Sequence, residues 1–261
     1  MNIPDESRTM SGANLAYGSF AEIYDLLMDD IDYDAWADYY LRLLALSGLT
    51  PRTLCDCACG TGSMSVRFAK RGMRVTGVDI SERMLAIGQE KGRAFGVQVM
   101  YVHQDMCCLT LPKQVDALIC ACDGVNYLLD DDRLRAFFRS AYLAIRPGGA
   151  FAFDVSSPWK LEHVLGDQFF GEDRDDVTYL WKNSYSTRER TVSMDLTFFV
   201  RRGDGLYRRF DEYHVQKAHE PAHLISLMAE QGFGEICTYG DLTLEPPAPQ
   251  ALRIHFIAKR Q

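Results

Sequence analysis

The sequence predicts an α/β fold, with a mainly parallel sheet covered by helices on both faces and an antiparallel β flap inserted near its end. Between residues 54 and 155, short apolar segments alternate with amphipathic segments of helical period. This alternation is typical of parallel sheets with helical crossovers. Between residues 159 and 220 it stops, and three strand-like segments follow one another. Neighbouring strands without helices between them indicate an antiparallel unit.

Two amphipathic helices precede the alternating region. Apolar and aromatic residues recur at helical intervals in 17–28 and again in 36–44, after a polar start at 1–12. Aromatic residues at this spacing most often form core rather than ligand contacts. The elements expected next are a strand at 54–58, a helix at 63–71, a strand at 74–79, a helix at 82–95, strands at 97–102 and 117–121, a helix from 130 to the Pro147-Gly148-Gly149 sequence, and a strand at 150–155.

The second half of the chain sets the domain organisation. The flap strands are expected at 177–185, 191–201 and 206–217, followed by a helix at 221–231 and strands at 236–239 and 252–258. The sequence therefore predicts one α/β domain made of residues 1–158 and 221–261, with helices within 15–48 as its cap. Residues 159–220 would form the flap over the substrate.

The composition indicates a cytoplasmic globular protein. Of 261 residues, 47% are hydrophobic and 25% charged, as in ordinary globular domains. No apolar run approaches the roughly 18 residues that a membrane span needs, and the first residues lack the pattern of a secretory signal. The net charge is −8, whereas nucleic-acid binders usually present a basic face. We therefore expect neither a membrane protein nor a nucleic-acid binder.

Eight cysteines raise the question of a metal or disulfide site. Cys55, Cys57 and Cys59 alternate along one predicted strand, and Cys120 and Cys122 along another, without the C-x-x-C spacing of common zinc sites. Because free cysteine behaves as a small buried hydrophobe, we expect filler beside the sheet and no metal site.

Acidic residues at four strand ends accompany a glycine turn. Gly60-Thr-Gly62 joins the first strand to its helix. Glycine lets the backbone approach a ligand closely, and the helix N-terminus offers free N–H groups. Ligands of open α/β sheets bind at the carboxyl ends of the strands. The acids at these ends are Asp56, Asp79, Asp105 and Asp123.

Two of these acids suggest contacts with an adenosine. Asp79 lies 17 positions after Gly62, where a carboxylate can accept hydrogen bonds from both ribose hydroxyls; the alternative is a helix cap. Asp105 with Met106 can hold an adenine, the carboxylate at its amino group and the thioether against its ring. The alternative for that pair is a plain strand end.

Two nucleotide-type cofactors fit the glycine turn. A dinucleotide would use G-x-G-x-x-G/A, but Ser65 stands at the third small position. Asp56 would repel a pyrophosphate and suits a ligand with an ammonium group. S-adenosylmethionine has such a group, a ribose, an adenine and a sulfonium, and no phosphate. We therefore favour S-adenosylmethionine, with an NAD-dependent oxidoreductase as the alternative.

Successive segments resemble the motifs of class I S-adenosylmethionine-dependent methyltransferases, and further ones resemble their bacterial YqeM-type subgroup. The general motifs are Asp56-Cys-Ala-Cys-Gly60-Thr-Gly62, Val75-Thr-Gly-Val-Asp79, His103-Gln-Asp105-Met106 and Arg146-Pro-Gly-Gly149. The narrower resemblance comes from 17–25, 122–127 and 153–158. It implies a Rossmann-like sheet of seven strands with the last antiparallel. The implied cofactor-binding set is Tyr17, Tyr24, Trp36, Asp56, Ala58, Gly60, Gly62, Asp79, Ile80, Asp105, Met106 and Asp123.

The residues do not name a catalytic group. Methyl transfer from a sulfonium is an in-line displacement that positioning and desolvation can drive, and a base is needed only if the acceptor must lose a proton first. His163 and Tyr127 are candidates, although a structural role suits His163 better. We expect a small-molecule acceptor through nitrogen or oxygen. A non-catalytic protein that binds S-adenosylmethionine or a partner is the other alternative.

Overall fold

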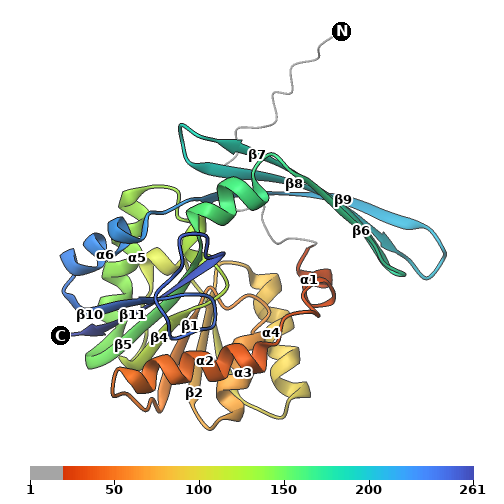
Figure 1. Ribbon diagram of the computed structural model, residues 1–261. Coiled ribbons are helices and arrows are strands. Elements are labelled where there is room, and N and C mark those ends of the chain that lie inside the picture. The colour runs from red at the N-terminus through yellow and green to blue at the C-terminus, as the bar shows by residue number, and fades with distance from the viewer. Residues whose placement is uncertain (1–19) are drawn as a thin grey trace.

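A seven-stranded sheet forms the centre of the molecule (Figure 1). The computed structural model describes residues 20–261. The strand order is β10-β11-β5-β4-β1-β2-β3, and β11 alone among these runs antiparallel to its neighbours. The strands are β1 Thr53–Cys57, β2 Arg74–Asp79, β3 Val99–His103, β4 Val115–Cys120, β5 Ile145–Ser156, β10 Phe233–Tyr239 and β11 Arg253–Arg260. The predicted fold class is confirmed.

Helices cover both faces of this sheet and bury two separate cores (Figure 1). On one face lie α2 Tyr33–Leu46, α3 Ser63–Lys70 and α4 Glu82–Ala94, and on the other α5 Asp131–Ala144 and α6 Pro221–Glu230. Three of them begin at an N-cap side chain. Asp32, Ser81 and Asp130 each accept a hydrogen bond from a backbone N–H group of the helix that follows. The apolar faces then pack on the sheet, with Phe153 and Phe256 stacked 4.6 Å apart on adjacent strands.

A second, four-stranded antiparallel sheet lies across the strand ends of the first (Figure 1). Its strands are β6 Phe169–Asp173, β7 Val177–Ser186, β8 Thr191–Arg201 and β9 Tyr207–Lys217. The name flap is used below for this sheet and the π-helical turn before it, Lys160–Leu165. The sequence predicted three of the four strands. It missed β6, an exposed pentapeptide with a central glycine and no alternation of polarity, and the π-helical turn, whose period differs from 3.6.

One buried side chain holds the two ends of the flap together. Asn126, in the short helix η3 Gly124–Tyr127, donates to the carbonyls of Ser156 at 3.0 Å and Lys217 at 2.9 Å. Its Oδ1 accepts the N–H of Ser156 at 2.9 Å. The chain therefore leaves β5 and returns from β9 at adjacent points.

Helix α1, Ala21–Leu27, joins the flap to the glycine turn. Phe20 and Ile23 pack on Val177 and Phe198 of the flap. On the opposite side, the Asp25 carboxylate accepts a hydrogen bond of 2.7 Å from the Thr61 hydroxyl and forms an ion pair with Lys91 at 2.8 Å. The predicted cap thus contacts both parts of the molecule at once.

The structure refines the expected element boundaries. Helix α2 begins at Tyr33, because Asp32 caps it. The helix expected to end at Pro147 ends at Ala144, and residues 146–149 form an irregularity within β5, where Ile145 pairs with Val115 but Ala150 pairs with Ala117. Tyr17 and the polar start of the chain lie outside the described residues. Within residues 20–261, no helix has the length and apolar character needed to cross a membrane.

Candidate active site

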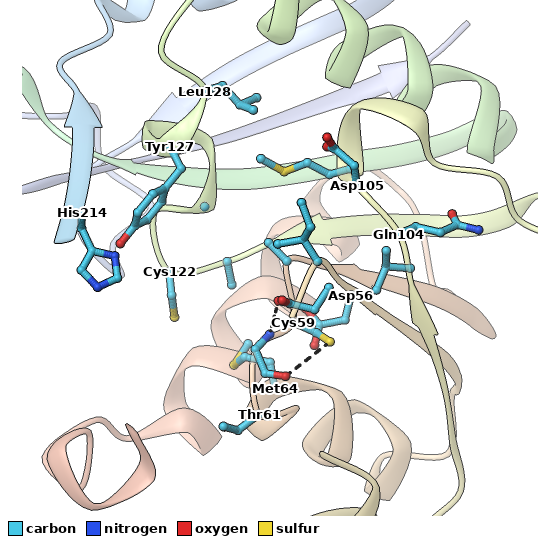
Figure 2. A pocket seen from close by; sticks show the side chains of 18 of the residues that line it. Asp56, Cys59, Thr61, Met64, Gln104, Asp105, Cys122, Tyr127, Leu128 and His214 are labelled. Carbon is cyan, nitrogen blue, oxygen red and sulfur yellow. Dashed lines mark hydrogen bonds between the residues drawn. The ribbon is translucent and has the colours of Figure 1, made fainter. Parts of the chain in front are cut away.

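A cavity of about 410 Å³ lies at the carboxyl ends of β1, β2 and β4, with residues of β9 on its flap side. Three groups of side chains line it (Figure 2). Asp56, Cys59, Thr61 and Met64 surround the glycine turn, Gln104 and Asp105 follow β3, and Tyr127 and His214 lie towards the flap. The strand ends that the sequence indicated therefore meet at one site.

The glycine turn owes its shape to left-handed backbone. Ala58, Gly60 and Gly62 have φ values of 54°, 52° and 72°, a region that favours glycine. Gly62 also lies against the side chain of Tyr101 from β3, so that a Cβ atom there would come within 2.1 Å of the tyrosine hydroxyl oxygen. Gly60 lines the cavity, whereas Gly62 starts α3 behind it.

Gly62→Ala is expected to lower the free energy of unfolding by about 2–4 kcal/mol, from left-handed strain together with the clash against Tyr101. Gly48→Ala is the matched control, because Gly48 has a φ of 76° and a Cβ atom added there would meet no neighbouring atom within 4 Å; it should lose only about 1 kcal/mol. Urea unfolding of both variants measures the difference. Equal losses of unfolding free energy in the two variants would show that the Tyr101 side chain moves aside without destabilising the protein.

Asp79 fixes the turn with both carboxylate oxygens. One oxygen accepts the N–H of Gly60 and the other the N–H of Ser81, each at 2.8 Å. Burial raises its pKa, although these N–H groups oppose the shift. Each oxygen retains a second lone pair, and the side chain lines the cavity. The carboxylate can therefore accept further hydrogen bonds from a ligand.

Asp56 lies at the bottom of the cavity and is 1% exposed. Its Oδ2 accepts the Ser65 hydroxyl at 2.5 Å. Burial raises the pKa of this carboxyl to about 7, against the opposing effect of that hydrogen bond. The group therefore changes charge near neutral pH in the absence of a ligand.

Asp105 and Met106 line the far end of the cavity together with Ile80. The Asp105 carboxylate is already engaged by the guanidinium of Arg133 at 2.9 Å and by the N–H of Cys107 at 2.9 Å. Burial would raise its pKa, but these two donors hold the pKa below its usual range. Its charge is thus largely neutralised within the chain.

Asp123 and Trp36, two members of the cofactor-binding set that the resemblance implies, are not among the residues that line the cavity, although Cys122 and Gly124 are. The Asp123 carboxylate pairs with the guanidinium of Arg253 at 3.0 Å and accepts a hydrogen bond from the side-chain amide of Gln216 at 2.9 Å. Burial would raise its pKa, but mainly Arg253 lowers it to about 2. Trp36 packs with its ring 5.1 Å from the same guanidinium. Arg253, which is remote in sequence, thus contacts both side chains.

Buried Asp154 accepts hydrogen bonds from the backbone N–H groups of Cys122 and Asp123. It also forms an ion pair with Arg253 and accepts a hydrogen bond from the hydroxyl of Tyr40. Both residues of this turn have left-handed φ values, 59° and 56°. The network holds the end of β4 where Cys122 lines the cavity.

The flap side of the cavity carries His214, a residue that the sequence analysis did not select. It lies on β9 with its ring centroid 6.0 Å from that of Tyr127, and it is 6% exposed. The available signal was an alternating set of polar residues within a predicted strand, Glu212, His214 and Gln216, all buried on one face. Burial lowers the pKa of His214 to about 4, so its ring is neutral at physiological pH.

Of the two candidate bases, only Tyr127 lines the cavity. His163 belongs to the π-helical turn and stacks on Trp159 with ring centroids 3.8 Å apart. This packing agrees with the structural role expected for it. Tyr24, from α1, also lines the cavity.

Known proteins with related sequences share this architecture. Residues 54–149 match the methyltransferase domain family. A protein of Geobacillus sp. (strain WCH70) is 36% identical over 94% of this chain and all of its own length, and YqeM of Bacillus subtilis (strain 168) is 33% identical over 94% and 98%; both are named "putative methyltransferase". The crystal structure of an S-adenosylmethionine-dependent methyltransferase from Clostridium acetobutylicum ATCC 824 is 31% identical, with a TM-score of 0.84 over 93% of this chain and 98% of that one. The chain belongs to the S-adenosylmethionine-dependent methyltransferases.

The cofactor of this methyltransferase is S-adenosylmethionine, as the sequence predicted, and the cavity suits it chemically. Among the described residues that line it, Arg133 is the sole cation, and Asp105 already pairs with it. Asp56 and Asp79 lie near the glycine turn, where they would repel a pyrophosphate but accept hydroxyl and ammonium donors. None of the relatives named above is described as an oxidoreductase, so the nicotinamide alternative receives no support.

Proposed function

We propose that this methyltransferase transfers the methyl group of S-adenosylmethionine to a nitrogen atom of a small molecule held under the flap. The observation that carries the proposal is the division of one cavity into two ends. Acidic strand ends and the glycine turn form one end, and Tyr127 and His214 form the other. A cavity of about 410 Å³ falls in the size range of small-molecule sites.

At the first end, we assign Asp79 to the ribose hydroxyls, Ile80 and Met106 to the two faces of the adenine, and Asp56 to the amino-acid tail. The positions support this order, because Asp79 ends β2, Ile80 follows it, and Met106 follows β3. Asp105 would reach the adenine amino group with the oxygen lone pairs that Arg133 leaves available. Gly60 and Ala58 would contact the methionine portion through the backbone.

Relatives that align with most of the chain support nitrogen as the acceptor atom. A glycine/sarcosine N-methyltransferase of Halorhodospira halochloris is 29% identical over 82% of this chain, and a dTDP-amino-sugar N,N-dimethyltransferase of Streptomyces venezuelae is 28% identical over 75%. A ubiquinone biosynthesis O-methyltransferase of Pseudomonas putida (strain GB-1) aligns with 42% of the chain. Among these three relatives, the two that align with the larger share of the chain are named for amine acceptors.

The mechanism that the cavity supports is displacement by positioning. S-adenosylmethionine supplies a methyl group on a positively charged sulfur atom. The flap residues and α1 would exclude water and hold the amine in line with the methyl carbon, which is the main source of rate enhancement for such a reaction. A neutral amine needs no base before attack, and the resulting ammonium can lose its proton to water afterwards.

Incubation of the protein with methyl-labelled S-adenosylmethionine and a pool of small amines tests the proposal. We expect labelled N-methyl products and S-adenosylhomocysteine in equal amounts. Label that appears only in hydroxyl acceptors would overturn the nitrogen assignment. Tight cofactor binding with no transfer to amines, alcohols or a cell extract would favour the non-catalytic alternative.

The pKa of Asp56 yields a further expectation. Without ligand the carboxyl is largely protonated below its pKa of about 7. The ammonium group of S-adenosylmethionine nearby favours the ionised form and lowers that pKa. Binding between about pH 5 and 7 should therefore release up to about one proton per site.

Calorimetry at pH 6 in buffers of different ionisation enthalpy measures this release. Asp56→Asn keeps the size of the side chain and should remove the proton release, while Ser65 can still bond to the amide oxygen. An unchanged release in the variant would assign the proton to another group.

A further inference from the structure

We propose that Lys91 couples the glycine turn to α1, so that a cofactor bound at the turn holds α1 in place beside the cavity. Lys91 lies on α4, and its side chain is 13% exposed. It is a positioning residue, because it is not one of the described residues that line the cavity and would act on the ligand only through others. The inference rests on the placement of S-adenosylmethionine at the glycine turn proposed above.

The Lys91 ammonium joins α1 to the glycine turn and to the start of α3. Its Nζ lies 2.8 Å from the Asp25 carboxylate, 2.9 Å from the Thr61 hydroxyl and 2.6 Å from the Ser63 hydroxyl. An ammonium has three N–H donors, so each donor has one acceptor. The Thr61 hydroxyl accepts from Lys91 and donates to Asp25 at 2.7 Å, which closes a ring of three hydrogen bonds.

Burial gives the ion pair its importance. Thr61 and Ser63 are both buried. Burial lowers the pKa of Lys91, and the Asp25 carboxylate opposes that shift. An ammonium taken out of water needs a partner of opposite charge. Asp25 supplies that charge while α1 lies against the turn, so the ion pair favours the docked position of the helix.

Helix α1 depends on tertiary contacts for its order. It has seven residues, and isolated helices shorter than about 12 residues are marginal in water. On one side Phe20 and Ile23 pack against β7 and β8 of the flap, and on the other Asp25 contacts Lys91. In Figure 1, α1 accordingly lies between the flap and α4. Its position therefore depends on the turn as well as on the flap.

The same contacts reach the wall of the cavity. Thr61 and Ser63 line the cavity at the glycine turn, and so does Tyr24, which precedes Asp25 in α1. A ligand that fixes the turn therefore also fixes two of the three acceptors of Lys91. Coupling between two sites is reciprocal, so the docked helix should in turn strengthen the binding of the cofactor.

Hydrogen–deuterium exchange of the peptide that contains α1, with and without S-adenosylhomocysteine, tests the coupling. In the unchanged protein we expect the ligand to slow exchange in residues 21–27 by about fivefold or more, the lower end of the usual range for coupled sites. Lys91→Met removes the three hydrogen bonds and should reduce this slowing to about twofold or less, while S-adenosylhomocysteine still binds. Because coupling is reciprocal, the affinity of the variant should fall by no more than the factor of protection that is lost.

Lys113→Met is the matched control. Lys113 is an exposed lysine that precedes β4, at the opposite end of that strand from the cavity. The same chemical change there should leave the ligand-dependent slowing in α1 intact, and exchange in β4 reports any global unfolding. Asp25→Asn removes the charge from the other side of the ion pair and should reduce the slowing as well, because hydrogen bonds to a charged acceptor are the stronger ones.

Two results would overturn the inference. One is equal exchange of α1 with and without S-adenosylhomocysteine in the unchanged protein. The other is full ligand-dependent slowing in Lys91→Met, since the lysine would then stabilise the fold without coupling the turn to the helix. If Lys91→Met fails to fold, the first comparison and Asp25→Asn decide. Failure of S-adenosylhomocysteine to bind the unchanged protein would overturn the cofactor placement itself, and with it this inference.

Discussion

Asp79→Ala is expected to raise the dissociation constant for S-adenosylmethionine by about 100-fold or more. The carboxylate that we assign to the ribose would lose two charge-assisted hydrogen bonds, each contributing about 1.5–3 kcal/mol. The variant also loses the acceptor of the Gly60 and Ser81 N–H groups, so the turn that contacts the cofactor becomes less ordered. Both losses act in the same direction. Isothermal titration calorimetry with S-adenosylmethionine measures the change.

Glu90→Ala is the control for this experiment, because Glu90 is an exposed acid on α4, the helix that follows Asp79. It should leave the affinity unchanged, since its charge lies away from the cavity lining. Circular dichroism of both variants confirms that the fold persists. An Asp79→Ala affinity within threefold of the original would remove the ribose assignment.

The second large effect concerns stability. Arg253→Met is expected to lower the free energy of unfolding by about 3–5 kcal/mol, because buried Asp154 and partly buried Asp123 both lose the guanidinium that pairs with them. Asp154 is 0% exposed and Arg253 only 13% exposed in their side chains. For a chain of this size such a loss lowers the melting temperature by roughly 6–20 °C. Thermal and urea unfolding measure it.

Arg209→Met is the matched change on the surface. Arg209 pairs with Asp211 at 2.9 Å, but both side chains are about 60% exposed (60% and 59%), and such pairs contribute at most about 1 kcal/mol. A loss of equal size in the two variants would mean that the buried network contributes no more than a solvated ion pair.

Much of the fold follows from local patterns. The strand and helix alternation from Thr53 to Ser156 could be predicted because each parallel strand is an apolar run bounded by turns and each helix has an apolar face. Two of the three helices, α4 and α5, also begin at a side-chain cap. The strand ends, and therefore the acids beside the glycine turn, were predicted for the same reason. The family resemblance supplied what local pattern does not contain, the reversed direction of β11.

The parts that could not be predicted depend on contacts remote in the sequence. Arg253 pairs with Asp123 across 130 positions, and no local pattern indicates that pair. His214 was not selected from the sequence. Its position on the cavity depends on how β9 lies over the strand ends. Pairwise chemistry between distant elements decides both cases.

The hydrogen bonds of Asn126 to both ends of the flap affect how the acceptor preference of this protein could change during evolution. Because Ser156 and Lys217 meet at one side chain, the intervening segment begins and ends at nearly the same point in space. A replacement of different length or sequence would have little chain entropy to overcome at its junctions, and the parallel strands that hold the cofactor would keep their pairing. Acceptor preference and cofactor use are thus expected to evolve separately. The same junctions mark where a flap from another methyltransferase should be grafted to change the acceptor.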